Sequence, residues 1–210
     1  PETANGTISL EAKKSILNLL EGKSAMAIGP GITTDPETVA LIGELLPLIQ
    51  CPLVIDADAL NAISANKDWL GSLHSKTVLT PHPKEMSRLT GVTTQEIQNS
   101  RIATAAKFSV DHSLTLILKG SPSLIGLSDG KVWIKSTGNA GMATGGSGDV
   151  LTGVIAGLMA QGMTSQQASI AGSYIHGVAG DYFAQNESET TLIARDLLRC
   201  LPDSLKRILP

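Results

Sequence analysis

The sequence predicts an α/β fold in which a mostly parallel central sheet lies between layers of helices. Three observations support this prediction. Short apolar runs alternate with longer segments of helical periodicity, a pattern typical of βαβ units. The apolar runs are continuous, as in strands that are covered on both faces of a sheet. Small, polar or charged residues follow these runs, as expected where parallel strands end at a ligand site.

The composition is that of one globular domain, residues 1–210, because 42% of the residues are hydrophobic and can form a sizeable core. A net charge of -3 without a basic stripe argues against nucleic acid as a partner, and 3% aromatic residues argue against base-stacking platforms.

No apolar run reaches the length of a membrane span, so no membrane is expected as a partner. Cys51 and Cys200 lie far apart and no secretory segment precedes them, which predicts reduced thiols in the cytoplasm.

Four short apolar runs are the predicted parallel strands. They are residues 25–29, 52–58, 76–82 and 114–120. A further segment, 123–136, has the pattern of a hairpin because Asp129 and Gly130 form a strong tight-turn pair. A hairpin near the edge is compatible with a sheet that is otherwise parallel.

Five longer segments have helical periodicity. They are residues 35–49, 93–110, 149–162, 164–185 and 191–201. Asp35 can cap the first helix, and Thr93 and Glu96 have the spacing of a capping box for the second. Gly and Ala are frequent in the last three segments, which would allow close packing against each other or a second subunit.

The most unusual segment is the glycine run STGNAGMATGGSGDVLTG, residues 136–153. A glycine-rich loop that opens a helix presents unpaired N–H groups to an anion, and the helix dipole adds to the attraction. The run is not a Walker loop, because Ser147 stands where that motif has Lys, and no third glycine follows Gly148 to make a dinucleotide fingerprint. The glycines expected to approach phosphate oxygens are Gly145, Gly146 and Gly148.

Asp149, directly after the last of these glycines, has two interpretations that the pattern leaves equally open. It could cap the helix, a common role for Asp. It could instead accept a proton from a substrate hydroxyl, although the helix terminus would stabilise its charged form and make it a weaker base. A capping Asp beside a phosphate could also serve both purposes.

The ends of two predicted strands, 52–58 and 76–82, carry titratable groups or lead into them. His82 lies between two prolines, and Glu85 falls near the first turn of a helix. His82 could bind a ligand and Glu85 could hold Mg2+ directly or through water, but on the segment alone an ordinary turn is the favoured interpretation. Asp56 and Asp58 could contribute to a metal shell, whereas a helix cap is the better explanation of Asp58.

Lys119 stands at the end of a strand and is followed by Gly120 and Ser121. A buried lysine without a partner is costly, so we expect a phosphate or an acidic side chain beside it. An exposed lysine that simply leaves the strand is the alternative. Gly29 and Gly31 form a turn before a helix, which allows either the close approach of a ligand or only a tight turn.

Five motifs together resemble one family. AIGPGI, VIDADALN, LTPHPKEM, LILKG and NAGMATGGSGDVLTGVIAGL occur in the order and spacing found in the ATP/ADP-dependent NAD(P)H-hydrate dehydratases, within residues 24–180. The resemblance implies a ribokinase-like, three-layer α/β/α fold. It also implies a repair reaction, in which hydrated NADH or NADPH is dehydrated and ADP or ATP is consumed. The expected route is phosphorylation of the ring hydroxyl followed by loss of phosphate.

The resemblance also implies roles for individual residues. Asp149 would contact and deprotonate the hydroxyl, and Gly31 and His82 would bind the hydrated nicotinamide nucleotide. Glu85 would support Mg2+, because it follows His82 at the spacing of a metal-linked motif in related kinases. The residues expected to contact the adenine nucleotide are Lys119, Gly120, Ser121, Pro122, Ser123, Gly145, Gly146 and Gly148.

The family's domain opens with a further strand, glycine loop and helix, so we expect the chain to be a fragment that lacks this first unit. The expected protein is a cytoplasmic homo-oligomer, with a tetramer as one form, and has a functional link to an NAD(P)H-hydrate epimerase. Two other functions remain open. One is a ribokinase-like kinase of a thiazole or pyrimidine alcohol, against which the long glycine motif argues. The other is a nucleotide-binding protein without catalysis, which would be expected to lack Asp149 or the loop glycines.

Overall fold

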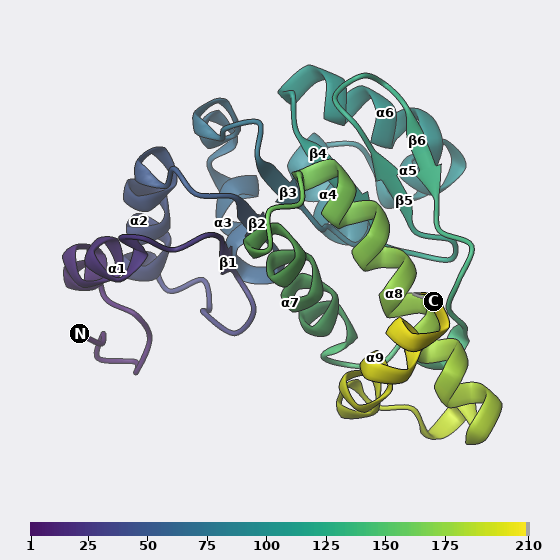
Figure 1. Ribbon diagram of the computed structural model, residues 1–210. Coiled ribbons are helices and arrows are strands. Elements are labelled where there is room, and N and C mark those ends of the chain that lie inside the picture. The colour runs from purple at the N-terminus through teal and green to yellow at the C-terminus, as the bar shows by residue number, and fades with distance from the viewer. Residues whose placement is uncertain (209–210) are drawn as a thin grey trace.

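The computed structural model describes residues 1–208 and contains the predicted sheet, whose six strands are arranged in chain order (Figure 1). The parallel strands are β1 (Met26–Ile28), β2 (Leu53–Ile55), β3 (Thr77–Leu79) and β4 (Thr115–Leu118). The antiparallel hairpin of β5 (Leu124–Gly126) and β6 (Val132–Ile134) completes one edge, as predicted. Every residue of β2 to β5 is buried, which confirms a sheet covered on both faces.

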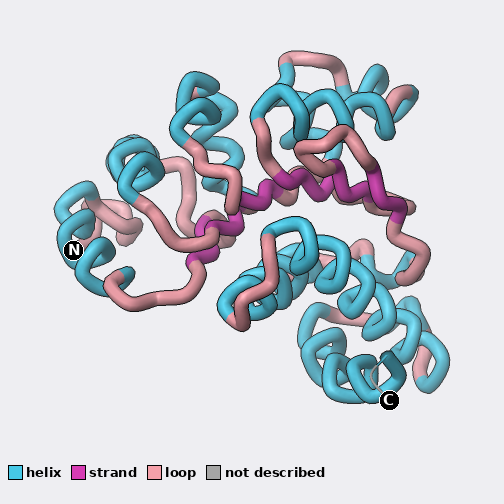
Figure 2. Tube along the Cα trace, turned by 45° about the horizontal axis from the view of Figure 1, so that its top comes forward, coloured by secondary structure: helices cyan, strands magenta, loops and turns pink. Residues whose placement is uncertain are grey.

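Helices cover the sheet on both sides, and Figure 2 shows the strands in one row between the two layers. One layer consists of α1 (Lys13–Leu20), α2 (Pro36–Leu45), α3 (Ala57–Ala65), α4 (Pro83–Thr90), α5 (Thr94–Asn99) and α6 (Arg101–His112). The other consists of α7 (Ser147–Ala160) and α8 (Ser165–Asn186), on which α9 (Ala194–Ile208) packs. Short 3-10 segments are Leu10–Ala12, Leu46–Leu48, Lys67–Ser72, Ala140–Met142 and Glu189–Thr191. The predicted three-layer architecture is confirmed.

Alternate residues of each strand supply the two cores. Leu53 and Ile55 of β2 pack into the core beneath α2 to α6, whereas Val54 packs against the other layer, where it meets Ile155 of α7. This follows from the strand geometry, which points successive side chains to opposite faces. Each such fully buried aliphatic side chain stabilises the fold by about 1.5–3 kcal/mol.

The register aligns the carboxyl ends of the parallel strands. Ile28 pairs with Ile55 and Ile55 with Leu79, and the N–H of Asp56 donates to the carbonyl of Ile28 at 3.0 Å. The N–H of Lys119 donates in turn to the carbonyl of Pro81 at 2.9 Å. Consequently the predicted polar strand ends lie next to each other, along the side of the sheet where the parallel strands end.

Some helix boundaries differ from the predictions. The segment 93–110 is not one helix but two, because the backbone of Ser100 leaves the helical region at φ -136° and ψ 37°. The helix expected at 35–49 ends at Leu45, since Pro47 lacks an N–H and its ring would clash with an earlier carbonyl. α7 begins two residues before Asp149, and α9 begins at Ala194 and extends beyond the predicted end at 201.

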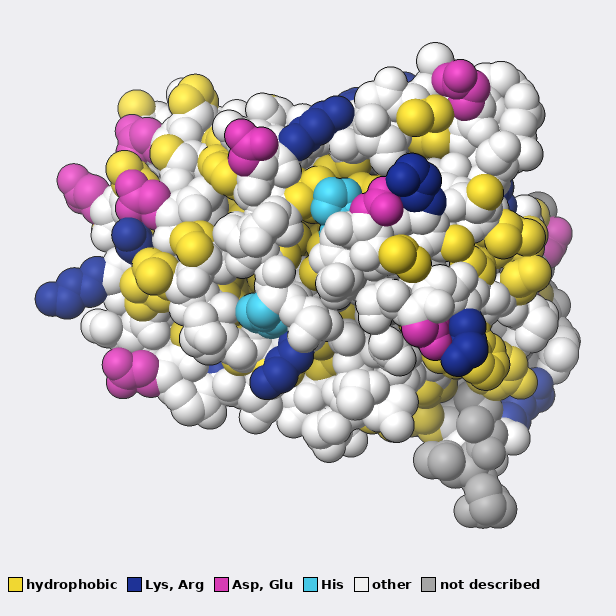
Figure 3. All heavy atoms as spheres, turned by 90° about the horizontal axis from the view of Figure 1, so that it is seen from above, with side chains coloured by type: hydrophobic (Ala, Val, Ile, Leu, Met, Phe, Trp, Pro, Cys, Tyr) yellow, Lys and Arg dark blue, Asp and Glu magenta, His cyan; other side chains and the backbone are white. Residues whose placement is uncertain are grey.

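The small residues of α8 permit the predicted close packing of the late helices. A Cβ atom at Gly172 would lie 3.0 Å from Cγ1 of Ile155 in α7, so glycine is the residue that fits this crossing. Cys51 and Cys200 are free thiols, as predicted. Within residues 1–208, no helix combines the length and the apolar character that crossing a membrane requires. On the face shown in Figure 3, charged side chains of both signs are scattered and form no basic stripe.

Candidate active site

The glycine run leads into the N-terminus of α7 without a side-chain cap. Gly146 occupies the N-cap position with φ 82°, a left-handed conformation that favours glycine. The first bond of the helix runs from the N–H of Val150 to the carbonyl of Gly146 at 3.1 Å. Within residues 1–208, the N–H groups of Gly148 and Asp149 have no hydrogen-bond acceptor. These two donors and the positive end of the helix dipole make a candidate anion site at the place where the sequence predicted one.

Asp149 lies in the first turn of α7 and does not cap the helix, so the capping interpretation is wrong. The helix starts earlier than the sequence suggested, and this places the Asp149 carboxylate past the cap position. The side chain is exposed and makes no hydrogen bond within the described chain. It lines a cavity of about 410 Å³ between α7, β1 and α2, together with Gly29 and Pro30 at the end of β1. A carboxylate that is free to accept a proton therefore borders both a cavity and the candidate anion site.

Asp56 and Lys119 form a partly buried ion pair directly behind the candidate anion site. The distance from Nζ of Lys119 to Oδ1 of Asp56 is 2.7 Å, and the Asp56 side chain is only 1% exposed. Thr152 of α7 donates its hydroxyl proton to Oδ2 of Asp56 at 2.9 Å. A Cβ atom at Gly148 would lie 3.3 Å from Nζ of Lys119, so the ammonium sits against the loop backbone. The acidic neighbour expected for Lys119 is confirmed.

Asp56, and not Asp58, is the N-cap of α3. Oδ1 of Asp56 accepts the N–H of Ala57 at 2.9 Å. The expected capping by Asp58 is wrong because α3 begins at Ala57, two residues earlier than a cap at Asp58 requires, which places Asp58 inside the first turn. Oδ2 of Asp58 instead accepts the N–H of Thr33 at 2.9 Å, which holds the turn that contains Gly31. Gly31 itself is exposed with φ 71° in this turn.

His82 and Glu85 bind each other at the start of α4. Nδ1 of His82 accepts the N–H groups of Lys84 and Glu85, and Oε2 of Glu85 accepts the N–H of His82 at 2.8 Å, which makes a capping box. Nε2 of His82 lies 3.4 Å from Oε1 of Glu85. The ordinary structural role that the segment suggested is therefore present. His82 is still 44% exposed, so its ring remains accessible to a ligand.

Glu85 lies in an environment that disfavours its charge. Burial raises the pKa of its carboxyl, and the negative charge of Asp56 acts in the same direction. The N–H of His82 and the positive charge of Lys119 lower the pKa and offset part of this rise. Within residues 1–208, no three His, Cys, Asp or Glu side chains converge as a metal-binding group. Any Mg2+ bound at Glu85 would therefore need ligands from phosphates and water, as is usual for this ion.

The segment 119–123 turns sharply beside the ion pair. Gly120 has φ 151°, and the hydroxyl of Ser123 donates to the carbonyl of Gly120 at 3.0 Å. Ser121 and Pro122 are exposed at the tip. Arg101, which the sequence did not single out, directs its guanidinium to the carbonyls of Leu118 and Lys119 at 3.4 and 3.3 Å.

A second buried contact supports the glycine run from the α8 side. Nε2 of His176 lies 3.5 Å from Oγ of Ser147, the first residue of α7. Burial lowers the pKa of His176 to about 4, and the positive charge of Lys135 acts in the same direction. The sequence did not single out His176 either. Its contact with Ser147 could not be read from sequence, because the two residues belong to different helices.

The structure thus brings together most of the predicted residues, but not all in one contact network. Lys119, Asp56, Gly148 and Thr152 are in direct contact, and Glu85 feels the charges of Asp56 and Lys119. Asp149 faces the cavity at the end of β1. Gly31 lies beyond that strand end and does not line the cavity.

The fold and this candidate anion site define the chain as a ribokinase-like protein. It superimposes on a ribokinase-like superfamily protein of Enterococcus faecalis with a TM-score of 0.81 and 29% identity, over 95% of this chain and 69% of that one. The family model of the NAD(P)H-hydrate dehydratases matches residues 2–203. The chain therefore belongs to the NAD(P)H-hydrate dehydratase family, as the motifs predicted.

Individual relatives agree with this assignment. The chain is 47% identical over 208 residues to the bifunctional NAD(P)H-hydrate repair enzyme Nnr of Moorella thermoacetica. That match covers 99% of this chain but 39% of the relative, so the chain spans about two fifths of that protein. The ADP/ATP-dependent NAD(P)H-hydrate dehydratase of Bacillus subtilis, co-crystallised with ATP/Mg2+, superimposes with a TM-score of 0.77 and 32% identity, over 88% of this chain and 64% of that one. A hydroxyethylthiazole kinase of Pyrococcus horikoshii, 16% identical with a TM-score of 0.70, shares the fold.

Proposed function

We propose that this chain catalyses the dehydration of hydrated NADH or NADPH, with ADP or ATP as co-substrate. One observation carries the proposal. The unpaired carboxylate of Asp149 borders a cavity and stands beside two free N–H groups at the start of α7. A proton acceptor and an anion site within one helical turn are what phosphoryl transfer to a hydroxyl requires.

In the first step, the ring hydroxyl of the substrate attacks the terminal phosphoryl group of the nucleotide. Asp149 accepts the hydroxyl proton, and the bond from phosphorus to the departing nucleotide breaks. The N–H groups of Gly148 and Asp149 stabilise the negative charge on the transferring group. In the second step the carbon–oxygen bond breaks and inorganic phosphate leaves, which restores the ring double bond with loss of a ring proton. Phosphate is a far better leaving group than hydroxide, and this explains the use of a nucleotide.

The residues behind the loop fit the nucleotide and its metal ion. In this proposal Lys119 and the backbone of residues 119–123 contact the adenine nucleotide, while Gly145, Gly146 and Gly148 line its phosphates. His82 and Gly31 contact the hydrated nicotinamide nucleotide. Glu85, on which the charge of Lys119 acts, could hold Mg2+ through water, and bound Mg2+ would neutralise phosphate charge during transfer.

The wider setting is part of the same proposal. Free thiols at Cys51 and Cys200 are consistent with the cytoplasm. Exposed apolar side chains such as Trp133 and Tyr174 are consistent with a homo-oligomer, in which a tetramer is one form. The word bifunctional in the names of the longer relatives supports a functional link to an NAD(P)H-hydrate epimerase.

The test supplies hydrated NADH with ADP and Mg2+ and follows the recovery of NADH absorbance. We expect recovery that depends on the nucleotide and stops when Mg2+ is chelated. A stable phosphate ester on some other alcohol, without recovery of NADH, would instead identify a small-molecule kinase. Nucleotide binding without either product would leave a non-catalytic binding protein.

A further inference from the structure

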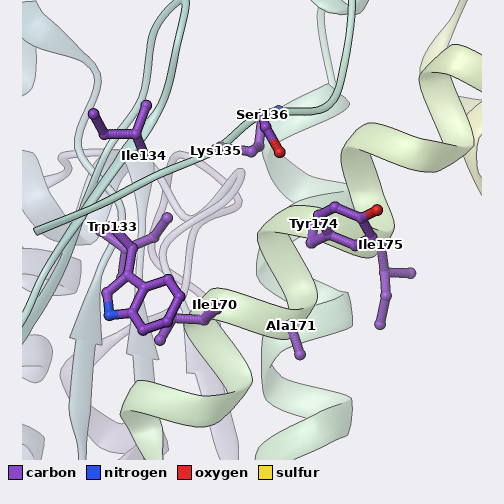
Figure 4. A pocket seen from close by; sticks show the side chains of 9 residues that line it. Trp133, Ile134, Lys135, Ser136, Ile170, Ala171, Tyr174 and Ile175 are labelled. Atoms are coloured by element: carbon purple, nitrogen blue, oxygen red, sulfur yellow. The ribbon is translucent and has the colours of Figure 1, made fainter. Parts of the chain in front are cut away.

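The first part of the glycine run, residues 137–142, lies against one face of α8. The chain reaches this face from β6, past the apolar cavity that Figure 4 shows between Trp133 and Tyr174. The hydroxyl of Thr137 donates to the carbonyl of Tyr174 at 3.1 Å. The glycine run is thus attached to α8 from its beginning, well before it reaches α7.

Two glycines of α8 allow this close approach. A Cβ atom at Gly177 would lie 2.7 Å from Cβ of Thr137. A Cβ atom at Gly180 would lie 2.7 Å from Cγ of Met142. Carbon atoms that are not bonded to each other do not approach this closely, so a larger residue at either position would push the glycine run away from the helix.

Asp181, one helical turn after Gly177, holds the same part of the glycine run by hydrogen bonds. Its Oδ2 accepts the N–H of Gly138 at 2.8 Å, and its Oδ1 accepts Nδ2 of Asn139 at 3.2 Å. Oδ1 of Asn139 accepts in turn the N–H of Gly141 at 3.1 Å. Hydrogen bonds to a carboxylate are roughly twice as strong as those between neutral groups. One side chain of α8 therefore fixes, directly or through Asn139, three residues of the glycine run.

The segment that Asp181 holds leads into the candidate anion site. Residues 143–146 join the 3-10 turn Ala140–Met142 to the first residue of α7, Ser147. Nε2 of His176, also in α8, lies 3.5 Å from Oγ of Ser147. Since α8 contacts the glycine run at both ends, the direction in which α7 presents its first N–H groups depends on these contacts.

We propose that Asp181 is a positioning residue of the phosphoryl-transfer site. It holds the start of the glycine run on α8, and the glycine run then presents Gly148 and Asp149 in the orientation that the transferring phosphoryl group requires. The inference rests on the proposed function for the reaction, but not for the contacts. A displacement of about 1 Å in a reacting group can lower a rate by about 10²-fold, so the effect is expected on turnover.

The test is the turnover of hydrated NADH by Asp181→Asn. Asparagine has the same size but keeps one acceptor oxygen, so its NH2 group must face one of the two donors that the carboxylate now accepts. We expect kcat to fall by about tenfold or more, while the KM for ADP stays within about threefold because residues 119–123 lie outside the glycine run. Asp203→Asn is the matched control, since Asp203 pairs with the exposed Lys206 at 3.1 Å in α9, and it should keep the wild-type kcat.

A double variant tests whether the hydrogen bonds themselves are responsible. Asp181→Asn combined with Asn139→Asp exchanges the donor and the acceptor between the two side chains. The amide oxygen at position 181 can then accept the N–H of Gly138, and the amide NH2 can donate to the carboxylate at position 139. The other oxygen of that carboxylate still accepts the N–H of Gly141. We expect kcat to return to within about threefold of the wild type, and a double variant no faster than Asp181→Asn would overturn the inference.

Hydrogen exchange separates this inference from the dehydratase proposal, because it requires no substrate. In ligand-free Asp181→Asn the amides of residues 137–149 should exchange about tenfold faster than in the wild type, and the double variant should reverse this change. The amides of β2 and β4 should keep their protection, which shows that the variant is folded. Unchanged exchange in residues 137–149 would overturn the inference.

The turnover results then have distinct meanings. Faster exchange with a kcat within about twofold of the wild type would make Asp181 only a structural contact, and would overturn the inference while the dehydratase proposal stands. If the wild type does not recover NADH from the hydrate, the dehydratase proposal fails. In that case faster exchange that the double variant reverses still supports Asp181 as the residue that positions the glycine run.

Discussion

Substitution of Asp56 by alanine should destabilise the protein more than the loss of any exposed ion pair. Asp56 joins three elements, because it caps α3, pairs with Lys119 after β4 and accepts the hydroxyl of Thr152 in α7. Alanine removes all three contacts at once. It also leaves the ammonium of Lys119 without its counter-ion in an environment that is largely closed to water.

The size of the effect follows from burial. Removal of one partner from a buried ion pair costs about 3–5 kcal/mol. The Lys119 side chain is 22% exposed and can regain some hydration, so we expect about 3 kcal/mol, at the low end of that range. For a chain of this length such a loss lowers the unfolding temperature by about 6–12 °C. Thr152→Val, which removes one hydrogen bond to Asp56, should cost about 1 kcal/mol.

The assay is urea unfolding followed by the fluorescence of Trp69 and Trp133. Asp111→Ala is the control, because Asp111 pairs with Lys107 at 2.8 Å on the exposed surface of α6 and should lose no more than about 0.5 kcal/mol. If Asp56→Ala unfolds like this control, the contacts of Asp56 do not hold α3, Lys119 and α7 together, and the reasoning from burial is wrong.

Two other predictions concern the same edge of the sheet. In Gly148→Ala the new Cβ would lie 3.3 Å from Nζ of Lys119, so we expect turnover to fall by about tenfold as the ammonium shifts. Gly157→Ala is the control, because its new Cβ meets no atom within 4 Å; it should keep full turnover and gain up to about 1 kcal/mol of stability. Equal turnover in the two variants would refute this prediction. Because burial raises the pKa of Glu85 above its ordinary value of 4.5, the stability that its protonated form provides is present below pH 4.5 and is lost as the pH rises through the folded pKa. The unfolding free energy of the wild type, measured relative to that of Glu85→Gln, should therefore fall as the pH rises from about 4 to 7. If this difference in unfolding free energy is constant over the range, burial does not raise the pKa of the Glu85 carboxyl.

Much of the fold could be predicted because local rules agreed with each other. The Asp129-Gly130 turn identified the hairpin, and the continuous apolar runs identified strands that prove to be buried on both faces. The break at Ser100 was missed, since helical periodicity continues across a single residue that leaves the helical conformation. The start of α7 was also missed, because Gly146 at the N-cap has no side chain to mark the position.

The candidate site was predictable by residue type but not by contact. Lys119 was expected to have an acidic neighbour, and the strand register places Asp56, 63 positions earlier, beside it. Thr152 was not anticipated, because its bond to Asp56 spans 96 positions and depends on how α7 crosses the sheet. Asp181 and Arg101 carried no motif. They are noticeable only because the folded chain brings Asp181 to the glycine run and Arg101 to the end of β4.

The most direct test of the central claim is the turnover of hydrated NADH by Asp149→Asn. Asparagine keeps the size of the side chain but cannot accept the hydroxyl proton. We predict that NADH recovery falls by about 10²- to 10⁴-fold, while ADP affinity measured by calorimetry changes by less than about threefold. Turnover near the wild-type rate would contradict the account, because Asp149 would then be only a residue in the first turn of α7.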